Sequence, residues 1–310
     1  MSPAAVLALA CGLTAMIAAY VALWLDYPPR EPLLPLAIVV VAGGVLGPAV
    51  LAAAARLGAL SPRGAAALAV LAPLGLALIG LAAARALAGP LEGALLGTAG
   101  GAAAGAVTVL WFAHSGYLSA ATDALPAVVT CTGAAAVLGA GVGRARLAGR
   151  PAVAGALLLL GIVLAGTTAA PWLAGLAGVP AKGETALAAA RLAVPLVALV
   201  AALLLAGRFE RRVFERELGE EVANGILPGE VVFVVASYPR RIRSAWWPRG
   251  DERRALVGLL RRLAFRKQQL HHLEGDRLHL AGLEVGRVRD RVRRLFDPRE
   301  VEALAREFVG

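Results

Sequence analysis

Residues 91–113, LEGALLGTAGGAAAGAVTVLWFA, carry a single charged side chain, at their second position. Glycines recur in steps of four at Gly93, Gly97, Gly101 and Gly105. Positions four apart lie on one face of an α-helix, and small residues on one face let a neighbouring helix approach closely within a membrane. The stretch is also long enough to cross a hydrocarbon core of about 30 Å. It therefore predicts a transmembrane helix that packs through its glycines.

The rest of the chain has a similar composition. Its 310 residues are 59% hydrophobic and 17% charged, with a mean hydropathy of +0.72, whereas a soluble domain has roughly a quarter of its residues charged. This composition excludes a soluble enzyme and a disordered chain, and the unbroken apolar runs exclude a β-barrel, whose strands alternate. The fold class predicted is an all-α, polytopic bundle of about seven spans, near residues 4–25, 33–55, 64–84, 91–113, 124–143, 152–177 and 186–207.

Charge divides the chain near residue 207. Residues 1–207 hold nine basic and five acidic side chains, whereas residues 208–310 hold twenty-two and sixteen. Arginines follow the last apolar run at once, so the positive-inside rule predicts that this tail is cytoplasmic. We expect a transmembrane bundle over 1–207 and a small, basic helical domain over 208–310, in the inner (plasma) membrane. The first run has no basic segment before it, which favours a retained span over a signal peptide.

The tail has its own helix signals. Asn224-Gly225 is a helix C-cap pattern, and residues 229–237 predict a short apolar helix or strand. Asp251 is an expected N-cap for a helix from Glu252 to about Leu273, and a last helix is expected over 283–296. The sixteen acids interleaved with the arginines disfavour nucleic-acid binding.

A group of basic and aromatic residues in the tail predicts a membrane-surface site. Arginines flanking tryptophans are typical of an interfacial anchor on an anionic leaflet. The partner expected for this site is therefore the anionic lipid of the inner leaflet. The site comprises Arg240, Arg241, Arg243, Trp246, Trp247 and Arg249.

Groups able to handle a proton are absent from the middle of every predicted span. Ionisable groups at membrane depth are costly and usually functional, but here the polar residues at that depth are threonines, which can bond to their own helix. His114 and Asp123 in a loop are the nearest approach to an acid–base or metal site. Glu92 lies at the opposite end of the helix, about 33 Å from His114 at 1.5 Å per residue.

Neither a metal nor a cofactor is predicted from the remaining residues. His271, His272 and His279 lack cysteine partners and a ligand-like spacing, so a polar surface is the simpler interpretation. The two cysteines, Cys11 and Cys131, both lie inside apolar runs and are interpreted as small interior residues.

The order of several short segments resembles the PrsW family of intramembrane peptidases, bacterial relatives of the CAAX-prenyl peptidases that cut membrane-anchored regulators such as anti-sigma factors. The tail is similar to that of actinobacterial members. The matching segments, in chain order, are Leu25 to Pro32, Ala72-Pro73-Leu74, Gly89 to Gly97, Trp111-Phe112, Thr130 to Gly133, Leu227 to Val231, the arginine-rich residues 240–249, and Leu263 to Arg266. The resemblance implies a helical membrane scaffold and a membrane-anchored regulatory protein as partner.

The family's catalytic residues do not carry over. Leu76 and Ala77 stand where the family has its glutamate pair, and the family's later Glu-Asn pair falls on Val107-Thr108 or Thr108-Val109. Ala127 stands near the histidine position. Leucine, alanine and valine side chains neither accept a proton nor bind a metal. By this resemblance the scaffold is present and no catalytic residue is assigned.

Three functions remain open from the sequence. The first is a non-catalytic pseudopeptidase that binds membrane-anchored partners without cutting them. The second is an active peptidase that uses displaced polar groups such as Thr108, His114 and Asp123. The third is a small-molecule transporter, which would need a polar cavity at mid-membrane between repeated halves.

Overall fold

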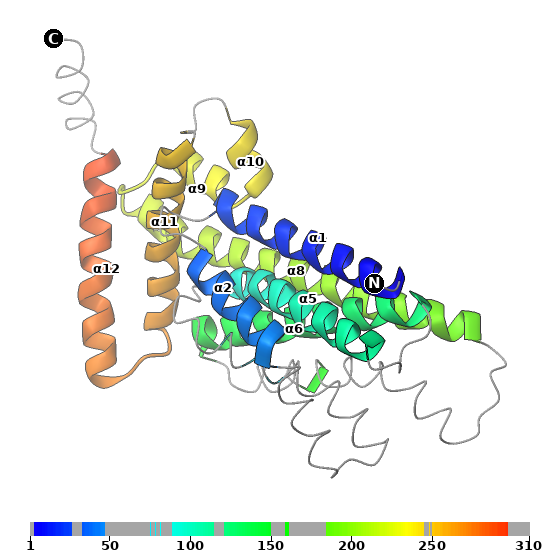
Figure 1. Ribbon diagram of the computed structural model, residues 1–310. Coiled ribbons are helices and arrows are strands. Elements are labelled where there is room, and N and C mark those ends of the chain that lie inside the picture. Colours follow the sequence, from blue (N-terminus) through cyan, green and yellow to red (C-terminus); the bar gives the residue numbers. More distant parts are fainter. Residues whose placement is uncertain are drawn as a thin grey trace. The chain divides into compact units, whose positions relative to one another are not determined.

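The computed structural model describes residues 3–26, 33–46, 75, 78, 81, 89–114, 121–149, 159–160, 184–244, 248 and 250–296. Within these ranges every regular element is a helix, and no strand occurs. The elements are α1 (Pro3–Asp26), α2 (Leu33–Val41), a π-helical turn η1 (Ala42–Leu46), α5 (Pro90–His114), α6 (Ala121–Ala148), α8 (Glu184–Ala223), α9 (Gly229–Val235), α10 (Tyr238–Arg243), α11 (Gly250–Leu270) and α12 (Gly275–Phe296) (Figure 1).

Four of these helices are long and apolar enough to cross a membrane. The spans are Ala5–Leu23 in α1, Pro90–Leu110 in α5, Val128–Ala148 in α6 and Leu192–Ala223 in α8, and Leu34–Val45 is a shorter apolar helix. Of the seven spans predicted, the one at 33–55 is described only as far as residue 46. The spans at 64–84 and 152–177 lie almost wholly outside the described residues. For the described residues, the prediction of an all-helical fold with helices long and apolar enough to cross a membrane is confirmed.

The chain divides into two compact units, with one boundary inside α8 between Ala206 and Gly207. The first unit contains most of α1, α2, α5 and α6, together with α8 up to Ala206. The second contains the rest of α8 and α9 to α12. Each unit is described below by itself.

Within the first unit, α5 and α6 form the interior. Most of their span residues are buried, whereas few of those of α1 and α8 are. Large aliphatic side chains stand out from the two exposed helices, among them Ile17 on α1 and Val197 on α8. Exposing apolar side chains to lipid carries no hydrophobic penalty, because lipid tails are as apolar as these side chains. The exposed faces therefore suit a hydrocarbon environment.

The second unit is a small helical assembly with its own apolar core. Val285, Val288 and Val292 repeat on one face of α12 and are buried, and α11 packs alongside this helix (Figure 1). The rings of Phe214 on α8 and Phe265 on α11 stack with their centroids 5.7 Å apart. Apolar residues spaced three and four apart on α11 and α12 thus bury a common stripe.

Helix ends in the second unit agree with the sequence in one place and differ in two. The C-cap at Asn224-Gly225 is confirmed, because Gly225 has φ +68° and α8 ends at Ala223. The N-cap assigned to Asp251 is wrong, since α11 already begins at Gly250. The last helix begins at Gly275, eight residues before the expected start. Leu278 and Leu280 are exposed there, so the apolar periodicity used to find the start gave no signal.

Candidate functional site

The glycine face of α5 lies directly against α6. A Cβ atom built on Gly93 would overlap the carbonyl oxygen of Gly139, one on Gly97 that of Ala135, and one on Gly101 that of Cys131. One on Gly105 would lie 2.8 Å from the Cα of Val128. As the α5 position rises by four, its α6 partner falls by about four, which is the register of an antiparallel helix pair.

This contact is made by backbone on both sides. A Cβ on Gly139 would overlap the carbonyl oxygen of Gly93, and one on Gly143 would overlap that of Gly89. Two backbones this close leave no space between them for water or for a side chain. Along this seam the α5–α6 pair is therefore sealed.

The other sides of this pair also pack through small residues. A Cβ on Gly12 of α1 would lie 2.8 Å from the Cβ of Ala106, and one on Gly43 of η1 would lie 2.5 Å from the carbonyl oxygen of Gly100. On α6, Gly133 lies against α8, where a Cβ would be 2.5 Å from the carbonyl oxygen of Pro195. Small residues thus bring α1, η1 and α8 close to the central pair.

The structure describes several buried polar side chains inside the first unit, and two of them make hydrogen bonds within their own helix. Thr98 donates to the carbonyl oxygen of Ala94 at 2.8 Å, and Thr132 donates to that of Val128 at 2.7 Å. The buried Thr108 hydroxyl makes no hydrogen bond in the described part of the chain. Glu92, in the first turn of α5, is only 4% exposed and has an interaction partner. Thr98 and Thr132 thus satisfy their hydroxyls within their own helices.

The positions implied by the family resemblance are only partly described. Val109 is fully buried, in a cluster with Ala8 and Val128. Ala127 lies within α6, and Leu76 and Ala77 lie outside the described residues. His114 ends α5, and Asp123 lies in the first turn of α6. The side chains of His114, Asp123 and Ala127 are not among those described, so the peptidase alternative built on them stays a prediction.

The described residues contain no group of three or more His, Cys, Asp or Glu side chains that could hold a metal ion. His271 Nε2 lies 3.2 Å from the Oε1 atom of the buried Glu217. His272 lies 3.4 Å from the Gln268 amide, and His279 is exposed. The rings of His271 and His272 lie edge to face, with their centroids 6.3 Å apart.

The predicted membrane-surface site is described at three of its six residues. The guanidinium of Arg240 lies 3.5 Å from the ring centre of the exposed Phe233, and donates to the Phe233 carbonyl oxygen at 3.3 Å. Arg241 is only 8% exposed and has a partner, while Arg243 is exposed. Trp246, Trp247 and Arg249 lie outside the described residues. Of the three described arginines, Arg243 is the most open to a lipid surface.

A buried ionic cluster in the second unit was missed by sequence reasoning. Glu210, Glu217 and Glu221 lie on one face of α8, at spacings of seven and four, and are at most 4% exposed. Both carboxylate oxygens of Glu210 accept from Arg261 Nη2 at 3.1 Å. The seven- and four-residue spacing of these glutamates is visible in the sequence. The cations that bind them stand about fifty residues later, so no local pattern connects the two.

Glu221 is the centre of this cluster. Lys267 Nζ of α11 donates to its Oε1 at 2.7 Å, and Arg289 of α12 donates to both of its oxygens at 2.7 and 2.9 Å. Lys267 also donates to Glu220 and to the Glu217 carbonyl oxygen, each at 2.8 Å. One carboxylate therefore joins α8, α11 and α12.

A second carboxylate, Glu284, connects α11 and α12 at the surface. It accepts from Arg262 and lies 3.1 Å from Arg266 Nε, and both arginines belong to α11. Burial alone would raise the pKa of Glu284, but the hydrogen bond from Arg262 and the charge of Arg266 outweigh it and hold the pKa below the ordinary value of 4.5. A lowered pKa means that the folded protein favours the charged carboxylate.

This lowered pKa predicts a pH dependence of stability. Ionised Glu284 stabilises the fold above its unfolded pKa, and the contribution is lost as pH falls through the lower folded pKa. Thermal unfolding measured from neutral pH down to acid should show this loss below about pH 4.5. In Glu284→Gln the unfolding temperature should depend less steeply on pH there. An unchanged slope in the variant would contradict the assignment.

No family model, curated protein or solved structure matches this chain.

Proposed function

We propose that this chain is a multi-pass membrane protein that binds other membrane-anchored protein segments without hydrolysing them. In this proposal it is a non-catalytic relative of the PrsW peptidases, held in the plasma membrane with residues 208–310 in the cytoplasm. The observation that carries the proposal is the sealed α5–α6 seam, in which backbone meets backbone at Gly93, Gly97 and Gly139. Peptide hydrolysis needs a positioned water and a proton-transfer group, and this seam has space for neither.

The exposed apolar surface of the first unit supports the binding half of the proposal. The apolar faces of α1 and α8 are exposed, with Ile17 60% and Val197 66% accessible. These side chains are β-branched and stiff at χ1, so they lose little freedom when another helix packs on them. Leu204, two helical turns after Val197 on α8, is also exposed. Such faces could accept either lipid tails or a partner span.

The test is co-reconstitution in liposomes with a membrane-anchored reporter that has a single leucine- and valine-rich span. We expect energy transfer between the two labelled proteins above that of a non-interacting span, and no cleavage product. Val197→Ala together with Leu204→Ala should lower the energy transfer, because these changes shrink the exposed α8 face. Leu34→Ala with Val45→Ala, which removes apolar surface from exposed positions outside α1 and α8, should leave the energy transfer unchanged.

Cleavage of the reporter would overturn the proposal if it were abolished by His114→Ala, Asp123→Asn or Thr108→Val. That result would favour the active peptidase instead. Energy transfer equal to that of the non-interacting span would remove the binding half of the proposal.

A further inference from the structure

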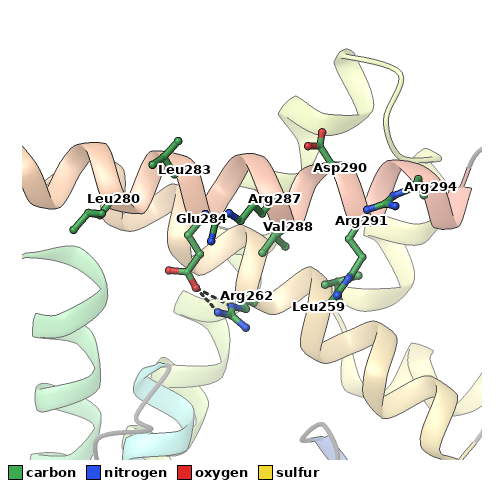
Figure 2. A pocket seen from close by; sticks show the side chains of 10 residues that line it. All are labelled: Leu259, Arg262, Leu280, Leu283, Glu284, Arg287, Val288, Asp290, Arg291 and Arg294. Carbon is green, nitrogen blue, oxygen red and sulfur yellow. Dashed lines mark hydrogen bonds and ion pairs between the residues drawn. The ribbon is translucent and has the colours of Figure 1, made fainter.

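A cleft of about 720 Å³ lies between α11 and α12 in the second unit. Leu280 and Leu283 line it toward one end of α12, and Arg291 and Arg294 toward the other, as Figure 2 shows. Leu280 is 65% exposed and Leu283 49% exposed, although both are large and apolar. An exposed apolar patch beside charged groups is typical of a binding surface.

The cleft carries more positive than negative side chains. Four arginines and two carboxylates line it, and one of those carboxylates, Glu284, is already bound by Arg262 and Arg266. Arg287, Arg291 and Arg294 are exposed and make no ion pair with another residue in the described part of the chain. Asp290 is the remaining acid in the cleft. The net local charge is therefore positive.

The spacing of these residues places them along one stripe of α12. Leu280, Leu283, Arg287, Arg291 and Arg294 are separated by three or four residues, so they share a helical face. This face is beside the buried stripe of valines rather than opposite to it, because Val288 also lines the cleft. α12 thus carries a fixed face that is apolar at its start and cationic at its end.

We propose that this face docks on anionic phospholipid, with phosphate at Arg287, Arg291 and Arg294 and acyl chain at Leu280 and Leu283. An anionic lipid matches both halves of the face, because it joins a negative headgroup to an apolar tail. The second unit includes the end of α8, a helix that is apolar enough to span a membrane. A chain anchored by α8 would therefore meet lipid headgroups. A second copy of the same cationic face would be repelled.

The experiment measures backbone hydrogen exchange of residues 280–294 in the full chain held in lipid nanodiscs. Discs of phosphatidylcholine alone are compared with discs in which phosphatidylglycerol is a substantial minority. If the lipid is present at about ten times its dissociation constant, exchange through local opening should slow roughly tenfold. High salt should reduce the effect, because it screens exposed charges.

Matched double variants separate this site from general attraction to a charged surface. Arg287→Gln with Arg291→Gln should abolish the slowing. Arg277→Gln with Arg293→Gln, which removes the same charge from exposed positions of α12 outside the cleft lining, should keep it. Equal loss in both pairs, or equal exchange in the two kinds of disc, would overturn the proposal.

Two further arms test the source of the negative charge. Inorganic phosphate or soluble polyglutamate is added to the phosphatidylcholine discs. Slowing by phosphate alone would make a free anion the ligand, and slowing by polyglutamate without any effect of phosphatidylglycerol would make it an acidic protein segment. Either result would overturn the lipid assignment. Neither arm depends on whether the first unit cuts or binds proteins.

Discussion

Gly97→Ala is expected to destabilise the membrane bundle by about 2 kcal/mol, because a methyl group there meets a backbone carbonyl. The atom it would overlap is the Ala135 oxygen of α6, and a helix backbone cannot rotate away as a flexible side chain can. The two helices would have to separate, and the packing along the whole seam would weaken. Equilibrium unfolding in mixed detergent and SDS measures the change.

Gly207→Ala is the matched control for this prediction. Gly207 is helical, but a Cβ built there has nothing within 4 Å. The same substitution should therefore stabilise α8 by up to about 1 kcal/mol, since alanine is the better helix former. If both variants unfolded at the same SDS fraction as the wild type, the close packing of α5 on α6 would be refuted.

Glu221→Gln is expected to destabilise the second unit by about 3 kcal/mol, because it removes the buried counter-charge that Lys267 and Arg289 share. Glu221 is fully buried and bonds to Lys267 and Arg289. Its loss weakens the connection between α8, α11 and α12 at the same time. Denaturant unfolding, with hydrogen exchange to locate the change in α11 and α12, measures the effect.

Glu215→Gln is the matched control on the same helix. Glu215 pairs with Arg211 at 2.7 Å, but both side chains are nearly half exposed. Exposed pairs contribute little, so the expected change is below about 1 kcal/mol. A comparable loss in both variants would show that the cluster around Glu221 has no special role.

The membrane helices could be predicted from sequence because their signal is local. The four-residue spacing of glycines in α5 is visible in residues 91–113, and so is the face on which they lie. Their partner is not visible, because no local pattern states which of several alanine-rich helices runs antiparallel to α5 or in which register. The pairing of Gly93 with Gly139 is a tertiary choice.

In the second unit, the sequence did not predict which charged side chains are buried. Residues 208–223 have the composition of a solvated helix, yet Glu210, Glu217 and Glu221 are buried in the structure. Burial of a carboxylate depends on cations that a distant helix supplies, and Arg261 and Lys267 stand about fifty residues away. The exposed leucines at the start of α12 also misled the prediction of where that helix begins.

The central claim is that the α5–α6 seam is sealed, and the native Cys131 tests it most directly. A Cβ on Gly105 would lie 3.2 Å from the Cβ of Cys131, which places this cysteine at the seam. With Cys11 changed to serine, a water-soluble maleimide should leave Cys131 unlabelled in liposomes and label it fully after denaturation in SDS. Labelling in intact liposomes as fast as that of a cysteine introduced at the exposed Glu215 would show a hydrated interior and contradict the account.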